Sequence, residues 1–443
     1  MSLRRRASLI VLAVVVIVAG LGAWLAPPTR PMAFAGGSAV TLANYSGPDP
    51  TGVPSELRGA DLVTRGRYLA TAADCGVCHT APGGAEFAGG LPFKTPFGTL
   101  YSPNITPDRE TGIGAWSEAD FLRAVHKGVA KDGSRLYPAF PYEAYSLMAD
   151  ADVLAIRAYL FSLAPVRNTP PANRLMFPFN QRPLMAIWGA LYNPDQRFRP
   201  HTDRSPQWNR GAYLVEALAH CGDCHTARNL AQAPDNRKKF GGAVIQGWRA
   251  YNITQDRASG VGAWTDAELA AYLRGGHVLG RGAAAGPMAE AINASLSRLA
   301  PSDTLAMVAY LRTIPAVGSR DLPAPKTELA SDLPKEMAGG GDRRGREVFA
   351  GACASCHGWS GKSPLFPHAN LTGVRAVNDP SAINVAQVVI NGARLERAGG
   401  DVVMPAFGQT YSNAEIAAVA NYVTARFGSA RSEITARDVA RLR

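Results

Sequence analysis

The sequence lacks any cysteine outside three short motifs. Its 443 residues contain six cysteines, and all six lie in Cys75-Gly-Val-Cys78-His79, Cys221-Gly-Asp-Cys224-His225 and Cys353-Ala-Ser-Cys356-His357. No thiol is therefore left over for a structural disulfide. No further C-x-x-C pair remains to complete a four-cysteine zinc site.

Several signatures of other protein classes are also missing. The sequence has no dinucleotide-binding or P-loop glycine pattern, no G-x-S-x-G segment and no zinc signature. The net charge of +11 and the pI near 9.5 arise from basic residues spread along the chain. Because no basic run is interleaved with aromatic residues, we expect no nucleic-acid binding.

The three C-x-x-C-H motifs are typical of covalent c-type haem attachment. Two cysteines three positions apart share one face of a helical turn, so both thiols can reach the vinyl groups of one porphyrin. The next histidine then points at the iron. The sequence therefore predicts three covalently bound haem c groups, with His79, His225 and His357 as the proximal ligands.

The amino-terminal residues have the pattern of a membrane segment. Three arginines, at positions 4–6, precede an uncharged, apolar stretch at positions 7–26. This length can span a bilayer as a helix, with the arginines on the cytoplasmic side. We expect a retained anchor; the alternative is a signal peptide cleaved after Ala33-Phe34-Ala35.

Similar segments recur around each motif, which indicates repeated units. Arg-Gly dipeptides at 65–66, 210–211 and 344–345 precede the motifs, and apolar helices are predicted at 153–160, 304–311 and 416–423. Ser117 and Thr265 are predicted to cap helices at equivalent places. We expect an all-α chain of three tandem class I-like cytochrome c domains. The predicted boundaries are anchor or signal 1–26, linker 27–56, domain one 57–163, connector 164–205, domain two 206–316, linker 317–341, domain three 342–430 and tail 431–443.

The connector at 164–205 has an unusual apolar stretch for a linker. Residues 177–188 read Phe-Pro-Phe-Asn-Gln-Arg-Pro-Leu-Met-Ala-Ile-Trp. A solvated linker seldom carries so many large apolar groups. We expect this stretch to pack between the first two domains, with contact to a partner as the alternative.

A second axial ligand is expected for each iron of an electron-transfer haem, and methionine is one usual choice. Met288 and Met404 lie in Gly- or Pro-bearing loops at equivalent places in the second and third units, so we predict them as distal ligands. The first unit has no methionine there. Met148 is the first candidate for it, and His126 or an open position are alternatives.

The motifs together resemble a known family, the trihaem cytochrome c subunit of membrane-bound bacterial dehydrogenases. Besides C-x-x-C-H, the resemblance rests on N-I-T-x-D…G-[IV]-G-x-W at 104–116 and 252–264 and on L-Y-P-A-x-P-Y at 136–142, and it covers Leu57 to Gly428. It implies thioether bonds at all six cysteines, the three histidines as proximal ligands, and Met288 and Met404 as distal ligands. Phe140 replaces the methionine of the alcohol dehydrogenase group, and this form resembles the cytochromes that accompany molybdenum hydroxylases.

The resemblance implies an electron-transfer role at the periplasmic face of the bacterial inner membrane. Electrons would come from a catalytic dehydrogenase subunit, whether molybdenum protein, quinoprotein or flavoprotein, and pass to ubiquinone or a terminal oxidase. Two alternatives remain open at this point. One is a self-contained, peroxidase-like haem enzyme with an open first haem; the other is a stand-alone periplasmic electron carrier.

Overall fold

The computed structural model describes residues 37–193, 195–328, 330, 343–365, 367–397 and 399–443, and the single positions 15, 16, 20 and 22. Within these residues no helix is both long and apolar enough to cross a membrane. The apolar stretch at 7–26 lies almost entirely outside the described residues, so the predicted anchor or signal stays a prediction.

The first motif lies among helices that precede residue 163. These elements are η2 (Leu42–Asn44), η3 (Ser55–Leu57), α2 (Leu62–Ala72), α3 (Cys75–His79), β1 (Pro92–Thr95), β2 (Gly98–Tyr101), α4 (Glu118–Lys127), α5 (Tyr142–Tyr145) and α6 (Asp150–Ser162). The connector adds β3 (Arg174–Leu175), which completes the sheet β1-β2-β3, and α7 (Leu184–Tyr192).

The second motif lies in a similar succession of elements. They are α8 (Pro206–Tyr213), the π-helical turn η4 (Leu214–Leu218), α9 (Gly222–His225), η5 (Asn236–Lys238), β4 (Ala243–Ile245), β5 (Trp248–Ala250), α10 (Asp266–Gly275), β6 (His277–Val278), β7 (Gly282–Ala283), α11 (Pro287–Ala294), η6 (Leu296–Arg298) and α12 (Pro301–Leu311).

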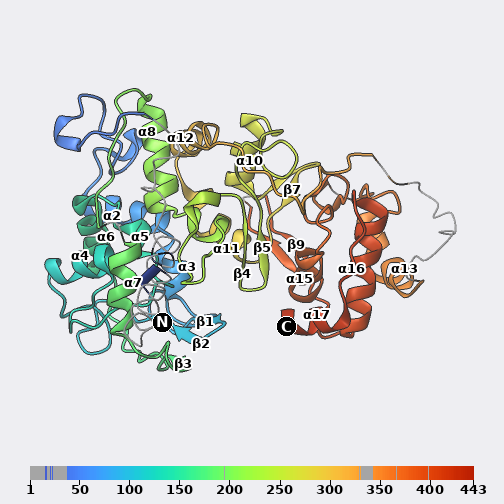
Figure 1. Ribbon diagram of the computed structural model, residues 1–443, viewed down its shortest axis with the longest axis horizontal. Helices are drawn as coiled ribbons and strands as arrows, with labels where there is room; N and C mark the ends of the chain where they lie inside the picture. Colours follow the sequence, from blue (N-terminus) through green and yellow to red (C-terminus); the bar gives the residue numbers. More distant parts are fainter. Residues whose placement is uncertain are drawn as a thin grey trace, which may run out of the picture.

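The third motif lies in the last part of the chain. Its elements are α13 (Arg343–Val348), the π-helical turn η7 (Phe349–Cys353), α14 (Ala354–His357), η8 (Pro367–Ala369), α15 (Ile383–Asn391), β8 (Ala393–Leu395), β9 (Val402–Met404), α16 (Asn413–Phe427) and α17 (Ala436–Leu442). Figure 1 shows the molecule as elongated, with α2 and α6 at one end and α13 and α16 at the other.

Three helix pairs organise the fold: α2 with α6, α8 with α12, and α13 with α16. Each pair crosses closely at a glycine. A Cβ added to Gly66 would lie 1.9 Å from the Ala155 carbonyl oxygen, and one added to Gly211 would lie 1.9 Å from that of Ala306. Only glycine therefore permits these helices to approach as closely as they do. We call them the first, second and third helix pairs.

The predicted helices are present at the predicted places. The apolar stretches at 153–160, 304–311 and 416–423 fall inside α6, α12 and α16. Ser117 caps α4 and Thr265 caps α10, each as a reciprocal capping box with an acidic residue three positions on. Apolar residues on these helices build one large core around the first two pairs and a separate core around the third.

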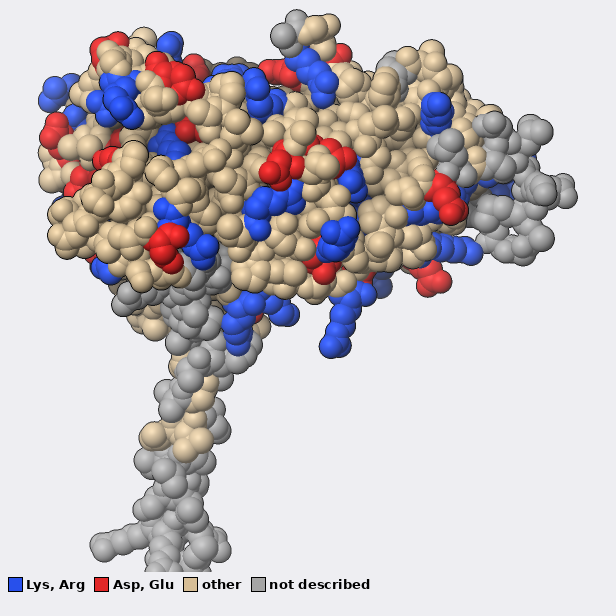
Figure 2. All heavy atoms as spheres, turned by 90° about the horizontal axis from the view of Figure 1, so that it is seen from above, with Lys and Arg blue, Asp and Glu red and all other residues tan. Residues whose placement is uncertain are grey.

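The chain is rich in helices, as predicted, but the described residues also contain nine short strands in four small sheets. The strands are two to four residues long and form antiparallel hairpins, with β3 added at one edge. On the face seen in Figure 2, acidic and basic side chains are interspersed, and broad areas carry neither.

Candidate functional site

Each C-x-x-C-H motif forms a single helical turn that follows a longer helix. The first turn, α3, begins after Asp74, which adopts a left-handed conformation with φ 56°, whereas the second and third follow the π-helical turns η4 and η7. None of the six cysteines is paired in a disulfide. Burial raises the pKa of Cys75 to about 12 and that of Cys353 to about 11.

The three motif histidines share one hydrogen-bond arrangement. The Nδ1 atom of His79 lies 2.8 Å from the Pro103 carbonyl oxygen, that of His225 lies 2.6 Å from Tyr251 O, and that of His357 lies 2.6 Å from Ala369 O. A hydrogen bond from Nδ1–H to a carbonyl fixes the ring orientation and leaves Nε2 as the atom that can bind a metal ion. Burial lowers the pKa of all three imidazoles, which favours the neutral form that ligates iron.

The first and second motifs open into one cavity of 2260 Å³. Its walls include both cysteines and the histidine of each of these motifs. They also include apolar side chains of α4, α6, α7 and α11. The cavity is thus large and mostly apolar, with two pairs of thiols at its wall, and these residues fit the attachment of haem. The third motif lies elsewhere, where Cys353 packs against the core around the third helix pair.

The three candidate methionines lie at different kinds of position. Met288 is the second residue of α11; it lines the shared cavity and packs against the large core. Met404 ends β9, opposite Ala393, and packs against the third pair's core. Met148 is only 1% exposed, yet it also lines the shared cavity. Phe140 lines the same cavity, with its ring 5.4 Å from that of Tyr145.

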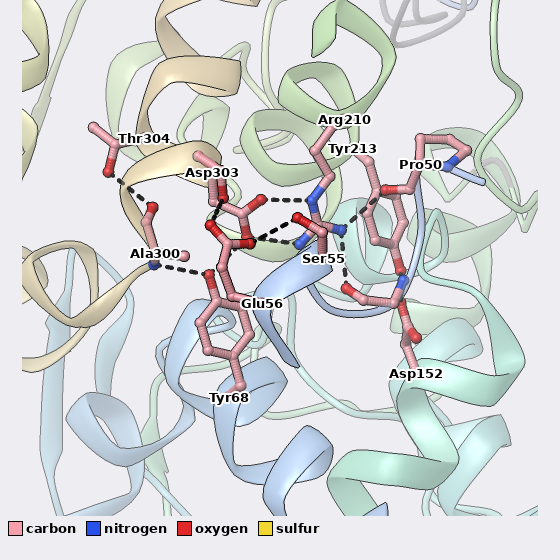
Figure 3. Close-up of polar contacts among 12 residues, drawn as sticks. Pro50, Ser55, Glu56, Tyr68, Asp152, Arg210, Tyr213, Ala300, Asp303 and Thr304 are labelled. Carbon is pink, nitrogen blue, oxygen red and sulfur yellow. Dashed lines mark hydrogen bonds and ion pairs between the residues drawn. The ribbon is translucent and has the colours of Figure 1, made fainter. Parts of the chain in front are cut away.

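A crossed pair of hydrogen bonds joins the first and second helix pairs (Figure 3). Tyr68 of α2 donates to Asp303 Oδ2 on α12 (2.7 Å), and Tyr213 of α8 donates to Asp152 Oδ2 on α6 (2.6 Å). The two tyrosines stand at the same place in the two Arg-Gly-x-Tyr segments. The network holds the two motif regions against one another.

Backbone amides and one arginine complete this network. Ala300 N–H donates to the Tyr68 hydroxyl and Ala149 N–H donates to the Tyr213 hydroxyl, both at 3.1 Å. Arg210 donates through Nε and Nη2 to both oxygens of Asp303, at 2.8 and 2.7 Å. Because Asp303 is 2% exposed, this ion pair is almost fully removed from water.

A second buried polar group lies beside the second motif. Arg228 contacts two acidic side chains, Glu143 of α5 and Asp223, and Asp223 stands between the two cysteines of that motif. The Nη1 atom of Arg228 lies 3.9 Å from Glu143 Oε1, and its Nη2 atom lies 3.2 Å from Asp223 Oδ1. Burial, and then the charge of Asp223, raise the pKa of Glu143 well above its usual range. The sequence interpretation missed this group and the crossed network. The two Arg-Gly-x-Tyr segments are a signal in the sequence for the tyrosines, but the aspartates that accept their hydrogen bonds lie in distant parts of the chain.

The prediction that the apolar stretch of the connector packs inside the chain is only partly confirmed. Trp188 and Tyr192 of α7 are buried, and the indole N–H of Trp188 donates to the Ala231 carbonyl oxygen at 2.8 Å, so one face packs inside the chain. Phe177 is 78% exposed and Ile187 is 62% exposed. The other face is therefore open.

Comparison with known proteins gives consistent relatives. The chain is 41% identical, over 86% of its length, to one of the subunits of nicotinate dehydrogenase from Pseudomonas putida, of which it spans only 31%. It is 38% identical to the gluconate 2-dehydrogenase cytochrome c subunit of Pantoea cypripedii, covering 86% of this chain and 89% of that protein. It is 37% identical to the fructose dehydrogenase cytochrome subunit of Gluconobacter japonicus, covering 86% and 82%.

A family model described as "Cytochrome C oxidase, cbb3-type, subunit III" matches residues 340–423, around the third motif. The similarity to the cytochrome subunits of two dehydrogenases covers 86% of this chain and more than four fifths of each relative, and it agrees with the motifs quoted above. The family implies covalently bound haem c and a role in electron transport within an oxidoreductase complex. This chain belongs to the family of dehydrogenase cytochrome c subunits.

Proposed function

We propose that the chain is a trihaem electron-transfer subunit made of three tandem cytochrome c domains. In this proposal Cys75, Cys78, Cys221, Cys224, Cys353 and Cys356 form the thioether bonds. His79, His225 and His357 are the proximal ligands. Met288 and Met404 are the distal ligands of the second and third haems, and Met148 is the candidate for the first.

One observation carries this proposal: the same carbonyl hydrogen bond orients the histidine of every motif. A chance match to C-x-x-C-H would not place three imidazoles in one arrangement. Bound haem c supplies the one-electron chemistry. The chain supplies the oriented imidazole, the two neighbouring thiols and an apolar surrounding, which together raise or lower the potential of the bound group.

The proposed electron donor is a separate catalytic dehydrogenase subunit, and the proposed acceptor is ubiquinone or a terminal oxidase at the periplasmic face of the bacterial inner membrane. The relatives named for gluconate and fructose dehydrogenases support a subunit role. The resemblance carried by Phe140 favours a partner of the molybdenum hydroxylase class, and the relative named for nicotinate dehydrogenase favours an N-heterocycle as its substrate.

The haem count tests the first part of the proposal. Intact-mass measurement of the matured chain should show three added haems, and the Cys353→Ala/Cys356→Ala variant should show two. Met404→Ala should remove the methionine-to-iron absorption of one haem and lower its potential, whereas the matched control Met176→Ala, at a surface methionine, should change neither. A chain with fewer than three haems contradicts the proposal.

Purification from the native membrane in mild detergent tests the partner. Nicotinate, gluconate, fructose and a simple alcohol would be offered in turn to the complex, and haem reduction followed by absorption. We expect one substrate to reduce all three haems through a co-purifying subunit. A lone chain that no substrate reduces, or one that turns over peroxide by itself, contradicts the proposal.

A further inference from the structure

One surface of the connector exposes an unusual number of large apolar side chains. We call it the α7 patch: Met176, Phe177, Phe179, Leu184, Ile187 and Leu191. These six are among only sixteen exposed large hydrophobic side chains in the described part of the chain, and they fall within sixteen consecutive positions. We propose that the α7 patch rests on an anionic phospholipid bilayer, an inference that builds on the membrane location in the proposed function.

Helix geometry puts three of these residues on one stripe. Leu184, Ile187 and Leu191 are spaced three and four positions apart along α7, so their side chains share a face. The opposite face is fixed to the protein, because the Trp188 ring lies 5.6 Å from that of Tyr142 and its indole N–H is bonded to Ala231. The exposed stripe therefore belongs to a well-anchored helix that has apolar side chains on both faces.

The remaining apolar residues of the patch extend the surface onto the small sheet. Phe179 packs on Phe97, with ring centroids 3.9 Å apart, and Met176 N–H donates to the Phe97 carbonyl oxygen. Figure 1 shows β3 and α7 at the same end of the molecule, far from α13 and α16. The patch is thus a continuation of the first helix pair's side of the protein.

Charge favours an anionic surface as the occupant. Residues 164–192 contain no aspartate or glutamate and three arginines. Arg167 is paired with Glu110, whereas Arg174 lies on β3 and Arg182 lies over the Tyr137 ring. In the β1-β2-β3 sheet, Lys94 pairs with Thr99, which in turn pairs with Arg174, so two basic side chains lie on one face of the sheet beside the patch. Apolar side chains flanked by basic ones are typical of surfaces that lie in the interface of an anionic membrane.

The chain outside the described body favours a bilayer over a protein partner. Positions 7–26 form an apolar stretch long enough to span a membrane, and only ten residues, 27–36, separate it from Gly37. Ten extended residues reach at most about 35 Å. An anchored chain would therefore keep its body near the bilayer, and the α7 patch is the surface best suited to contact it.

Photolabelling from within the lipid tests this inference. The full haem-loaded chain would be reconstituted into POPC/POPG (3:1) vesicles that carry a phosphatidylcholine with a diazirine in its acyl chain, and labelled peptides identified by mass spectrometry. We expect label in residues 174–192. Ile187→Asp/Leu191→Asp should reduce it about tenfold, which corresponds to about 1.4 kcal/mol. Leu305→Asp/Leu365→Asp, at exposed leucines elsewhere, should leave it unchanged.

The outcomes separate this inference from the proposed function. Label at positions 7–26 but none at 174–192, or equal label in the Ile187→Asp/Leu191→Asp variant, overturns the inference alone. Lack of label at both places contradicts the membrane location itself. Protection of the patch by a co-purified catalytic subunit, with no lipid label there, also overturns the inference and assigns the patch to that subunit.

Discussion

The first and second helix pairs are joined by two crossed tyrosine–aspartate hydrogen bonds, whereas the parts of the chain around the second and third pairs meet through strands and loops, where three arginines cross the junction. Across the first junction each pair gives one tyrosine hydroxyl to the other's aspartate. Across the second, Arg249 of β5 bonds Asp379 at 3.1 Å, Arg375 donates to the Ala258 carbonyl oxygen, and Arg397 donates to that of Gly275. Tyr251 also donates to Asp379 there, at 3.1 Å, but among the described residues no tyrosine hydrogen bond runs in the opposite direction, so the second junction lacks the reciprocal arrangement of the first.

Two residues explain why the third pair is joined differently. Glu347 stands where Tyr68 and Tyr213 stand in the Arg-Gly-x segments, so no hydroxyl donor is present there. Glu415, near the start of α16, accepts hydrogen bonds from Ser412 and caps its own helix. With carboxylates at both places, the crossed exchange cannot form. The comparison teaches that helix pairs with the same glycine crossing dock differently when the residues at their ends differ.

The largest effect should follow from loss of the buried carboxylate at the first junction. Asp303→Ala leaves Arg210, whose side chain is 13% exposed, without its ion-pair partner, and it also removes the acceptor for Tyr68. We expect the free energy of unfolding to fall by about 3–5 kcal/mol, measured by chemical denaturation of the haem-loaded chain. The control Asp266→Ala removes a pair whose aspartate is 72% exposed and should cost less than about 0.5 kcal/mol. Equal losses of unfolding free energy in the two variants would contradict a stabilising role for the buried Arg210–Asp303 ion pair.

A smaller effect is expected at the second junction. Arg249→Met removes the cation beside Asp379, but Asp379 keeps hydrogen bonds from Tyr251 and from the Ser381 amide. We expect a loss of about 2 kcal/mol, with faster hydrogen exchange in β5 and α15. Arg394→Met, at an arginine that is 65% exposed, is the control and should have no measurable effect. An equally large loss of unfolding free energy in Arg249→Met and Asp303→Ala would show that the two junctions contribute equally to stability.

The two crossed tyrosines should not be equivalent. Tyr213→Phe leaves buried Asp152 with the Gly52 amide as its remaining donor, whereas Tyr68→Phe leaves Asp303 bonded to Arg210. We expect losses of about 2 kcal/mol and about 1 kcal/mol, measured by the same denaturation. The reverse order would show that the arginine does not compensate for the lost hydroxyl.

The last prediction concerns the pH dependence of stability that arises from Glu143 at the first junction. Burial raises the pKa of Glu143 well above its ordinary value of 4.5, so above that pH the folded chain keeps a proton that the unfolded chain releases. Stability should therefore fall as the pH rises from about 5 towards the raised pKa, by at most about 1.4 kcal/mol per pH unit. Glu143→Gln should flatten this decline in thermal unfolding. Glu110→Gln, at an exposed glutamate, should not, and parallel profiles for all three proteins would exclude Glu143 as the cause.

The sequence predicted what is encoded locally. The motif turns, the capping boxes at Ser117 and Thr265 and the apolar helices α6, α12 and α16 all follow from signals within about fifteen residues. The strands were missed because runs of two to four residues carry no measurable alternation. The partners of Tyr68 and Tyr213 were missed because each lies in a different repeat, more than sixty positions away.

Only part of the candidate site could be predicted from local sequence. The spacing within each motif predicts the histidines as haem ligands, but the carbonyl groups that orient these histidines come from separate loops, such as those of Pro103 and Tyr251. The prediction for the connector was half right, since the apolar stretch at 177–188 both packs inside the chain and remains exposed. Hydrophobic content alone cannot tell which face of a helix a neighbour covers.

The glycine at each helix crossing limits which sequences the three helix pairs can have. A Cβ at Gly345 would lie 2.2 Å from the Ala418 carbonyl oxygen, a clash slightly milder than those at Gly66 and Gly211 but still far inside van der Waals contact. Elsewhere the helix pairs differ, as Tyr68 and Tyr213 do from Glu347. At these three positions even one added methyl group would separate the helices. The crossings are therefore the positions at which none of the three pairs can accept a larger side chain, whatever its other residues contact.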